Sequence, residues 1–346
     1  MNSWIIPRMN APFCSKGLNI SLSISGGRTY GNNIESFEPT KLTFARLFKA
    51  LGNQGNLIEG MKLHDYAQSI GLVKDALVVS SVVSFYGRFG AILEAEHVFA
   101  MDLKPIDVVS WNAMLSVYVK NGEGEKVLLL YRQMREEGMH PNAVTFVCIL
   151  NVCGSIRAVS KGQEIHAEIV KEGLLKENIL VGNALVDMYA KCSDLAKAQE
   201  VLRELPIRNV VSWSTLISGY AQAGLGHEAL SCFDNMQSDG LCANVVTFIS
   251  ILKACGCIEA IEKGKKVHNE VLSRGFLEKD TILGNALVVM YAKCDAMSES
   301  MYLFDTLHVR TLMTWNALMI GYACKGDSDH VFSMFERMQE EGTKPD

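Results

Sequence analysis

Hydrophobic residues recur at helical spacing along most of the chain, in paired segments separated by a short glycine-containing break. Residues 210–244 illustrate the unit. A first apolar stripe contains Val211, Leu216, Ile217 and Tyr220. The pattern breaks at Gly224-Leu-Gly226, and a second stripe contains Ala229, Leu230, Phe233 and Met236. Gly240 follows as a stop signal. This spacing predicts two amphipathic helices joined by a turn, which together form a helical hairpin.

The hairpins belong to a longer period of 102 residues. Trp111, Trp213 and Trp315 lie in closely similar stretches, each 102 residues from the next. Three blocks of this length fill residues 41–142, 143–244 and 245–346. A fixed period indicates a repeat architecture, because one hairpin cannot bury its hydrophobic faces without a neighbour.

Each block divides into three hairpin subunits of 31–36 residues. The nine subunits are 41–75, 76–107, 108–142, 143–178, 179–209, 210–244, 245–280, 281–311 and 312–346. We therefore expect an all-α solenoid of about nine helix-turn-helix repeats, without strands. Residues 1–40 lie outside this array.

Composition limits the partners of such a chain. It is 49% hydrophobic and 21% charged, as globular proteins are, and its net charge is −5. A nucleic acid would therefore be bound through local positive positions and base contacts, without a strong basic field. No apolar run approaches the roughly 20 residues of a membrane helix, so we expect no membrane partner.

Four of the ten cysteines recur with the repeat, which argues against a disulfide framework. Cys153 and Cys255 are one period apart, and so are Cys192 and Cys294. We interpret them as small buried residues with reduced thiols, which indicates an intracellular compartment.

Residues 1–40 have a different composition. They contain Arg8, Lys16, Arg28 and six serines, and no acidic residue precedes Glu35. This composition is typical of a mitochondrial or plastid transit peptide. The alternative is a disordered tail or a truncated first repeat.

The repeat signatures resemble those of the pentatricopeptide repeat family, and differ from the tetratricopeptide pattern of an early Trp followed by Leu-Gly and Tyr. They are Val-Val-Ser-Trp at 210–213, Tyr-Ala-Lys-Cys at 189–192 and 291–294, and loops ending in Pro141-Asn142 or Pro345-Asp346. The alternating lengths resemble the plant subclass with P-, L- and S-type repeats, here as L-S-P triplets and without a C-terminal DYW deaminase domain. The resemblance covers residues 41–346 and implies a right-handed superhelix whose first helices line the inner face.

In that family each repeat reads one RNA base. The resemblance assigns this role to the fifth and last residues of a repeat. The base-reading pairs are then Ser80/Asp107, Asn112/Asn142, Asn183/Asn209, Ser214/Asn244, Asn285/Thr311 and Asn316/Asp346. The family's code gives the target 5′-N-G-C-N-C-A-N-Y-U-3′. The L-type repeats carry Ala45, Val147 and Ile249 at the fifth position, and we interpret them as spacers.

Two further positions follow from the resemblance. The second residue of a repeat sandwiches the base, and in the P- and S-type repeats it is Leu77, Val109, Leu180, Val211, Ile282 or Met313. The thirteenth position carries Arg88, Lys120, Lys191 and Lys293, which we expect to contact phosphates. The alternative for these cations is solvated charge near a helix end, where the helix dipole favours it.

Other signals have structural explanations. His166-Ala-Glu168 matches half of a zinc deaminase motif, but the Pro-Cys-x-x-Cys half is absent. Cys255-Gly-Cys257 with His268 fits no zinc spacing. We expect Trp111, Trp213 and Trp315 to pack between hairpins and not to stack on bases. We expect no metal, cofactor or catalytic residue.

The resemblance implies sequence-specific binding of single-stranded RNA in a mitochondrion or chloroplast, by a monomer that is not an enzyme. In this subclass the usual consequence is C-to-U editing, with editing-complex proteins or a deaminase recruited in trans. The alternatives are RNA stabilisation or splicing, and a protein-binding scaffold. The array ends without a capping segment, so we expect the sequence to be a truncated form of a longer protein.

Overall fold

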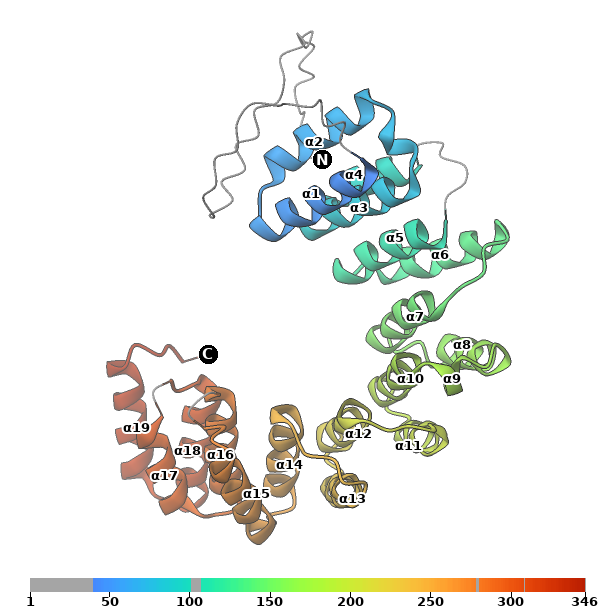
Figure 1. Ribbon diagram of the computed structural model, residues 1–346. Helices are drawn as coiled ribbons and strands as arrows, with labels where there is room; N and C mark the ends of the chain where they lie inside the picture. Colours follow the sequence, from blue (N-terminus) through green and yellow to red (C-terminus); the bar gives the residue numbers. More distant parts are fainter. Residues whose placement is uncertain (1–39, 101–106, 278–279, 308, 346) are drawn as a thin grey trace, which may run out of the picture. The chain divides into compact units, whose positions relative to one another are not determined.

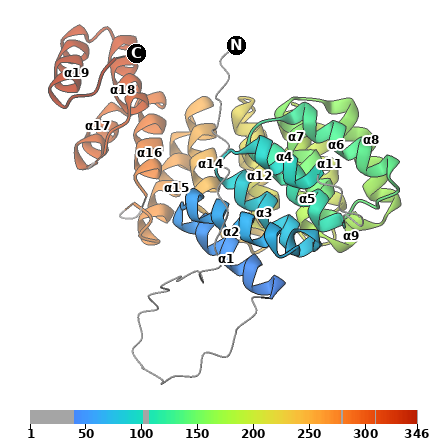
Figure 2. The same ribbon diagram turned by 90° about the horizontal axis from the view of Figure 1, so that it is seen from above.

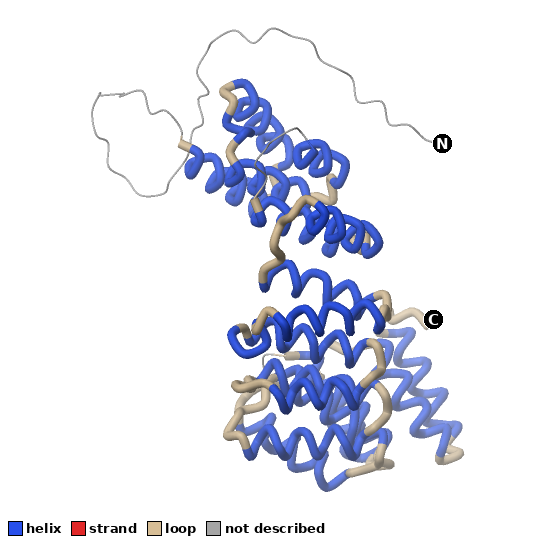
Figure 3. Tube along the Cα trace, turned by 90° about the vertical axis from the view of Figure 1, so that its right-hand side faces the viewer, coloured by secondary structure: helices blue, strands red, loops and turns tan. Residues whose placement is uncertain are grey.

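The computed structural model describes residues 40–100, 107–277, 280–307 and 309–345. Every regular element in these ranges is a helix (Figure 3). None of these helices is long and apolar enough to cross a membrane. The predicted leader lies outside the described residues, apart from Thr40.

Nine helical hairpins follow one another through the described residues (Figure 1). The first helices are α1 (Lys41–Gln54), α3 (Ala76–Arg88), α5 (Val108–Lys120), α7 (Ala143–Ser155), α10 (Ile179–Lys191), α12 (Val210–Gln222), α14 (Val245–Cys257), α16 (Thr281–Lys293) and α18 (Leu312–Cys324). The second helices are α2 (Leu57–Ser69), α4 (Ile92–Ala100), α6 (Gly124–Glu136), α8 (Val159–Lys171), α11 (Leu195–Glu204), α13 (Gly226–Ser238), α15 (Ile261–Ser273), α17 (Met297–Thr306) and α19 (Ser328–Glu340). The expected all-α repeat fold is confirmed.

Each first helix packs against the second helix of its own hairpin and against the first helices of the adjacent hairpins. From α3 on, each first helix also contacts the second helix of the preceding hairpin. Figure 2 shows this succession from a second direction, for example along α3, α5 and α7. Because consecutive hairpins cover each other's apolar stripes, the core is a continuous layer along the array.

The tryptophans lie inside this layer, as expected. Trp111 and Trp315 are fully buried, and Trp213 is nearly so. The ring of Trp315 meets Phe304 edge-on, with 4.6 Å between ring centroids. The cysteines among the described residues are free, and Cys153 and Cys255 are buried.

Two short helices were not predicted. The 3-10 helix η1 (Leu72–Lys74) and α9 (Leu174–Glu177) each follow the second helix of an L-type repeat. Each begins after a glycine with positive φ, Gly71 or Gly173. They bury one apolar side chain each, and at three or four residues they are too short to show a hydrophobic period.

The turn between the two helices of a hairpin uses a left-handed residue. Five hairpins place glycine there, as at Gly224, where φ is 76°. The other four place Arg157, Ser193, Glu259 and Asp295 at the same register, with φ between 54° and 64°. Because a Cβ atom is disfavoured in this conformation, these four turns hold local strain.

Candidate nucleic-acid interface

Charge is divided between the two kinds of helix. The first helices carry eight cationic side chains and a single acidic one, Asp187. The second helices carry 19 acidic and 12 cationic side chains. The net charge of the chain therefore conceals a basic layer of first helices and an acidic layer of second helices, which favours an anionic ligand on the first helices.

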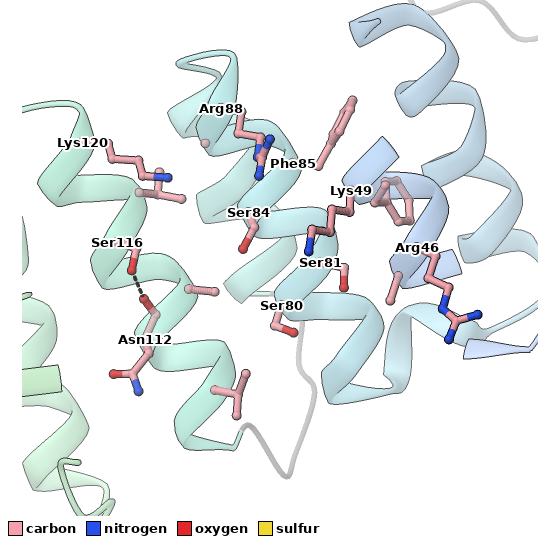
Figure 4. A pocket seen from close by; sticks show the side chains of 16 residues that line it. Arg46, Lys49, Ser80, Ser81, Ser84, Phe85, Arg88, Asn112, Ser116 and Lys120 are labelled. Atoms are coloured by element: carbon pink, nitrogen blue, oxygen red, sulfur yellow. Dashed lines mark hydrogen bonds between the residues drawn. The ribbon is translucent and has the colours of Figure 1, made fainter. Parts of the chain in front are cut away.

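A hollow of about 560 Å³ lies over α1, α3 and α5. Figure 4 shows four cations around it, Arg46, Lys49, Arg88 and Lys120, together with polar side chains that include Ser80 and Asn112. No acidic residue lines it. Arg88 also donates a hydrogen bond to Asn53. The hollow thus combines two predicted base-reading residues with two predicted phosphate contacts.

Two of the cations around this hollow, Arg46 and Lys49, were not predicted from the sequence. Arg46 and Lys49 belong to the first L-type repeat, at its sixth and ninth positions. The family resemblance points to the thirteenth position, which is Asn53 in this repeat, and therefore not to Arg46 or Lys49. The three-residue spacing from Arg46 to Lys49 on one helix was the available signal, since it places both on one face.

A second hollow of about 410 Å³ lies at the ends of α7, α10 and α12. Lys191 and Arg157 line it, and no acidic residue does. Lys191 also pairs with Asp187 at 2.7 Å, so its charge is partly compensated. The stem of Lys191 lies against Gly154, where an added Cβ would come within 3.1 Å of the lysine Cδ. Lys293 lies against Gly256 in the same way.

The fifth residues lie between consecutive hairpins. Ser80, Asn112, Asn183, Ser214 and Asn285 are only 5–8% exposed, and Asn316 in the final hairpin is half-buried. Two of the predicted pairs are in direct contact. Nδ2 of Asn112 donates to Oδ1 of Asn142 at 3.0 Å, and Nδ2 of Asn183 donates to Oδ1 of Asn209 at 3.5 Å. Only a small edge of each side chain therefore remains for a ligand.

The last residues of the repeats are helix N-caps. Asp107, Asn142, Asn209, Asn244 and Thr311 each accept a backbone N–H at the start of the next first helix. Side chains of this type are favoured at N-caps because they satisfy otherwise unpaired N–H groups. A scaffold would retain them for this reason too, so the last position alone does not identify an RNA-binding repeat. Asp346 lies outside the described residues.

The second residue of every first helix is aliphatic and exposed. Exposed fractions run from 39% at Leu77 to 71% at Met313. The set comprises Leu42, Leu77, Val109, Val144, Leu180, Val211, Val246, Ile282 and Met313. An apolar side chain at one register on nine successive helices is not explained by core packing, and regular exposed apolar surface marks a binding site.

Comparisons with known proteins agree with this architecture. A model described as "PPR repeat family" matches residues 106–155 and 208–257, and one described as "PPR repeat" matches 183–210 and 313–343. Two pentatricopeptide repeat-containing proteins of Arabidopsis thaliana are similar. One, named chloroplastic, is 32% identical over 90% of this chain and 50% of its own length. The other is 34% identical over 94% of this chain and 57% of its own length.

A solved structure has the same fold. The pentatricopeptide repeat protein PPR10, in complex with an 18-nt psaJ RNA element, superposes with a TM-score of 0.75 at 18% identity. The match covers 89% of this chain and 46% of PPR10. The chain spans about half the length of the curated relatives it matches. The matched repeats, the similarity to these plant proteins and the stacked hairpins together show that this chain is a PPR repeat protein.

Proposed function

We propose that this chain binds single-stranded RNA with sequence selectivity, along its first helices and at one nucleotide per repeat. The observation that carries the proposal is the row of nine exposed aliphatic residues at the second position. Bases are flat and apolar on their faces, so they can cover such side chains. In the L-type repeats, where Ala45, Val147 and Ile249 offer no hydrogen bond, the nucleotide is held but not selected.

The electrostatics of the first helices support the same ligand. Arg46, Lys49, Arg88 and Lys120 surround one hollow without an acidic neighbour among its lining residues. Phosphates would meet these cations while bases reach the fifth residues, which is the usual division between positioning and reading. A protein ligand would not require a cationic row beside a regular aliphatic row. The RNA bound to PPR10 in its crystal structure is a further reason to favour RNA.

We also propose a location and a role for this chain in the cell. Relatives named chloroplastic or mitochondrial support an organellar location. We propose that the chain is a monomeric address factor for RNA modification, with C-to-U editing performed by a deaminase recruited in trans. Editing at a cytidine near the bound sequence should then be lost from organellar transcripts when the protein is removed. Unchanged editing with a shortened or unspliced transcript would favour stabilisation or splicing instead.

Binding is tested with a labelled nine-nucleotide RNA that follows the predicted target, 5′-AGCACAACU-3′. Fluorescence anisotropy should show tighter binding to it than to a scrambled RNA of equal composition. Affinity for both should fall as salt increases, because phosphate binding releases counterions. Equal affinity for the two RNAs would refute sequence selectivity, and the absence of salt-dependent binding would favour the scaffold.

A further inference from the structure

A hydroxyl at the third residue of a repeat accompanies a polar fifth residue in the repeat before it. Ser80, Asn112, Asn183, Ser214 and Asn285 are followed in the next repeat by third residues Ser110, Thr145, Ser212, Thr247 and Thr314. The spacer residues Ala45, Val147 and Ile249 are followed instead by Val78, Val181 and Leu283. The five hydroxyl side chains are essentially inaccessible to solvent. Their distribution therefore follows the polarity of the neighbouring fifth residue.

Four of these hydroxyls bond directly to the fifth residue. The hydroxyl of Thr145 donates to Oδ1 of Asn112 at 2.7 Å, and that of Ser212 donates to Oδ1 of Asn183 at 2.5 Å. Thr314 bonds to Oδ1 of Asn285 at 2.5 Å, and the hydroxyls of Ser214 and Thr247 are 2.7 Å apart. Ser110 differs, since its hydroxyl donates to Asp107 at 3.0 Å. All three asparagines thus present oxygen, and not nitrogen, to the next repeat.

The capping box explains this orientation at Asn112. The backbone N–H of Asn142 donates to Oγ1 of Thr145 at 3.1 Å, and Oδ1 of Asn142 accepts the N–H of Thr145 at 3.2 Å. With its oxygen engaged as an acceptor, the Thr145 hydroxyl can donate to Oδ1 of Asn112 at 2.7 Å or to Oδ1 of Asn142 at 3.2 Å, and the shorter contact favours Asn112. The amide of Asn112 must then turn its Nδ2 the other way, where one N–H reaches Asn142. A second N–H remains for a ligand.

We propose that the third-position hydroxyl is a positioning residue for base selection, which acts by fixing the amide orientation of the preceding fifth-position asparagine. This inference rests on the proposed RNA-binding function. An asparagine held with N–H outward can donate to N3 of cytosine, which is an acceptor. The N3 of uracil carries a proton and would require the opposite orientation. Removing the hydroxyl frees the amide to rotate, and discrimination between the two pyrimidines falls.

The test uses two sites that serve as controls for each other. Thr145 acts on Asn112 and hence on the third nucleotide of the target, whereas Ser212 acts on Asn183 and the fifth nucleotide. Thr145→Val and Ser212→Ala remove the hydroxyls, and Thr145→Ser retains one. Affinities are measured for the target RNA and for RNAs with uridine at the third or the fifth nucleotide. Circular dichroism melting establishes that each variant folds.

Thr145→Val should lower the cytidine-over-uridine ratio at the third nucleotide by about three- to tenfold, the value of one hydrogen bond. The ratio at the fifth nucleotide should not change. Ser212→Ala should show the reverse pattern, and Thr145→Ser should match the unmodified protein. If Thr145→Val lowered the cytidine-over-uridine ratios at the third and the fifth nucleotide together, its effect would be general and the inference would be overturned. An unchanged ratio at the third nucleotide would overturn it as well. If the unmodified protein binds none of these RNAs, the proposed function itself fails.

Discussion

Nδ1 of His166 lies 3.0 Å from the phenol oxygen of Tyr189, and this hydrogen bond joins α8 to α10. The same contact recurs one period away in each direction, at 2.9 Å in both cases, as His64–Tyr86 and His268–Tyr291. Nε2 of each histidine is buried without a hydrogen-bond partner among the described residues. Every L-type repeat is therefore tied to the following S-type repeat by a histidine, which is buried at His64 and His166 and partly buried at His268.

These histidines predict a loss of stability in mild acid. Burial lowers the pKa of His64, His166 and His268 below the ordinary value of 6.5. Below pH 6.5 the unfolded chain binds protons that the folded chain resists, so stability is complete above this pH and falls as the pH drops below it. Urea unfolding at pH 7.5 and 5.5 should show the decline. His166→Gln should make it shallower, and an unchanged decline in that variant would contradict the explanation.

Gly60 and Gly162 occupy equivalent positions but should respond differently to alanine. A Cβ at Gly60 would lie 1.8 Å from Cζ of the Phe85 ring, whereas at Gly162 it would lie 2.4 Å from the flexible end of Met188. Overpacking of this kind costs about 1–3 kcal/mol. Thermal unfolding should show a larger loss for Gly60→Ala than for Gly162→Ala, because a methionine side chain can move aside. A larger loss for Gly162→Ala would contradict this order.

Glycine should relieve the strain in the left-handed turns. Glu259 has a φ of 54°, a conformation that costs a residue with a Cβ roughly 1–2 kcal/mol. Part of the gain is offset because glycine is more flexible in the unfolded chain. Glu259→Gly should raise stability by about 0.5–1 kcal/mol in urea unfolding. Gly224→Ala, at the same register, is the matched control and should lower it.

Exposed and buried aliphatic residues of one helix should separate binding from folding. Val211 is half exposed on α12, and Leu216 is fully buried. Val211→Ala should weaken RNA binding, with little change in the melting temperature. Leu216→Ala should instead destabilise the fold by about 2–5 kcal/mol. Unchanged affinity in folded Val211→Ala would remove the second position from the binding surface.

Salt dependence should distinguish the cations of the two helix layers. Lys120 lines the hollow on the first helices, whereas Lys126 lies on α6 and pairs with Glu96 at 2.9 Å. If Lys120 contacts one phosphate, Lys120→Ala should reduce the slope of log affinity against log salt by about 0.7. Lys126→Ala should leave the slope unchanged. Equal slopes in the two variants would show that Lys120 makes no phosphate contact.

The sequence predicted the fold closely because the period fixed the register. Every first helix begins at the first residue of a predicted subunit, as α12 does at Val210. The reason is local, since the last residue of each subunit, such as Asn209, caps the following helix. The short helices η1 and α9 escaped prediction because three or four residues cannot display a helical period.

The candidate surface was less accessible to sequence reasoning. The bulk charge of −5 gave no indication that the first helices carry a single acidic residue while the second helices carry 19. Thr145 has a counterpart one period later, Thr247, but its contact with Asn112 joins two neighbouring hairpins. No spacing along the sequence predicts such a contact, because it depends on how α5 packs against α7.

The exposed aliphatic row has a consequence for the life of the protein in a cell. Without a ligand, the chain exposes regularly spaced hydrophobic side chains of the kind that chaperones and proteases recognise. Occupancy by RNA would cover them and would shield the array from self-association. The abundance of the protein would then follow the supply of the RNA that it binds, because protein without bound RNA would be removed by cellular quality control.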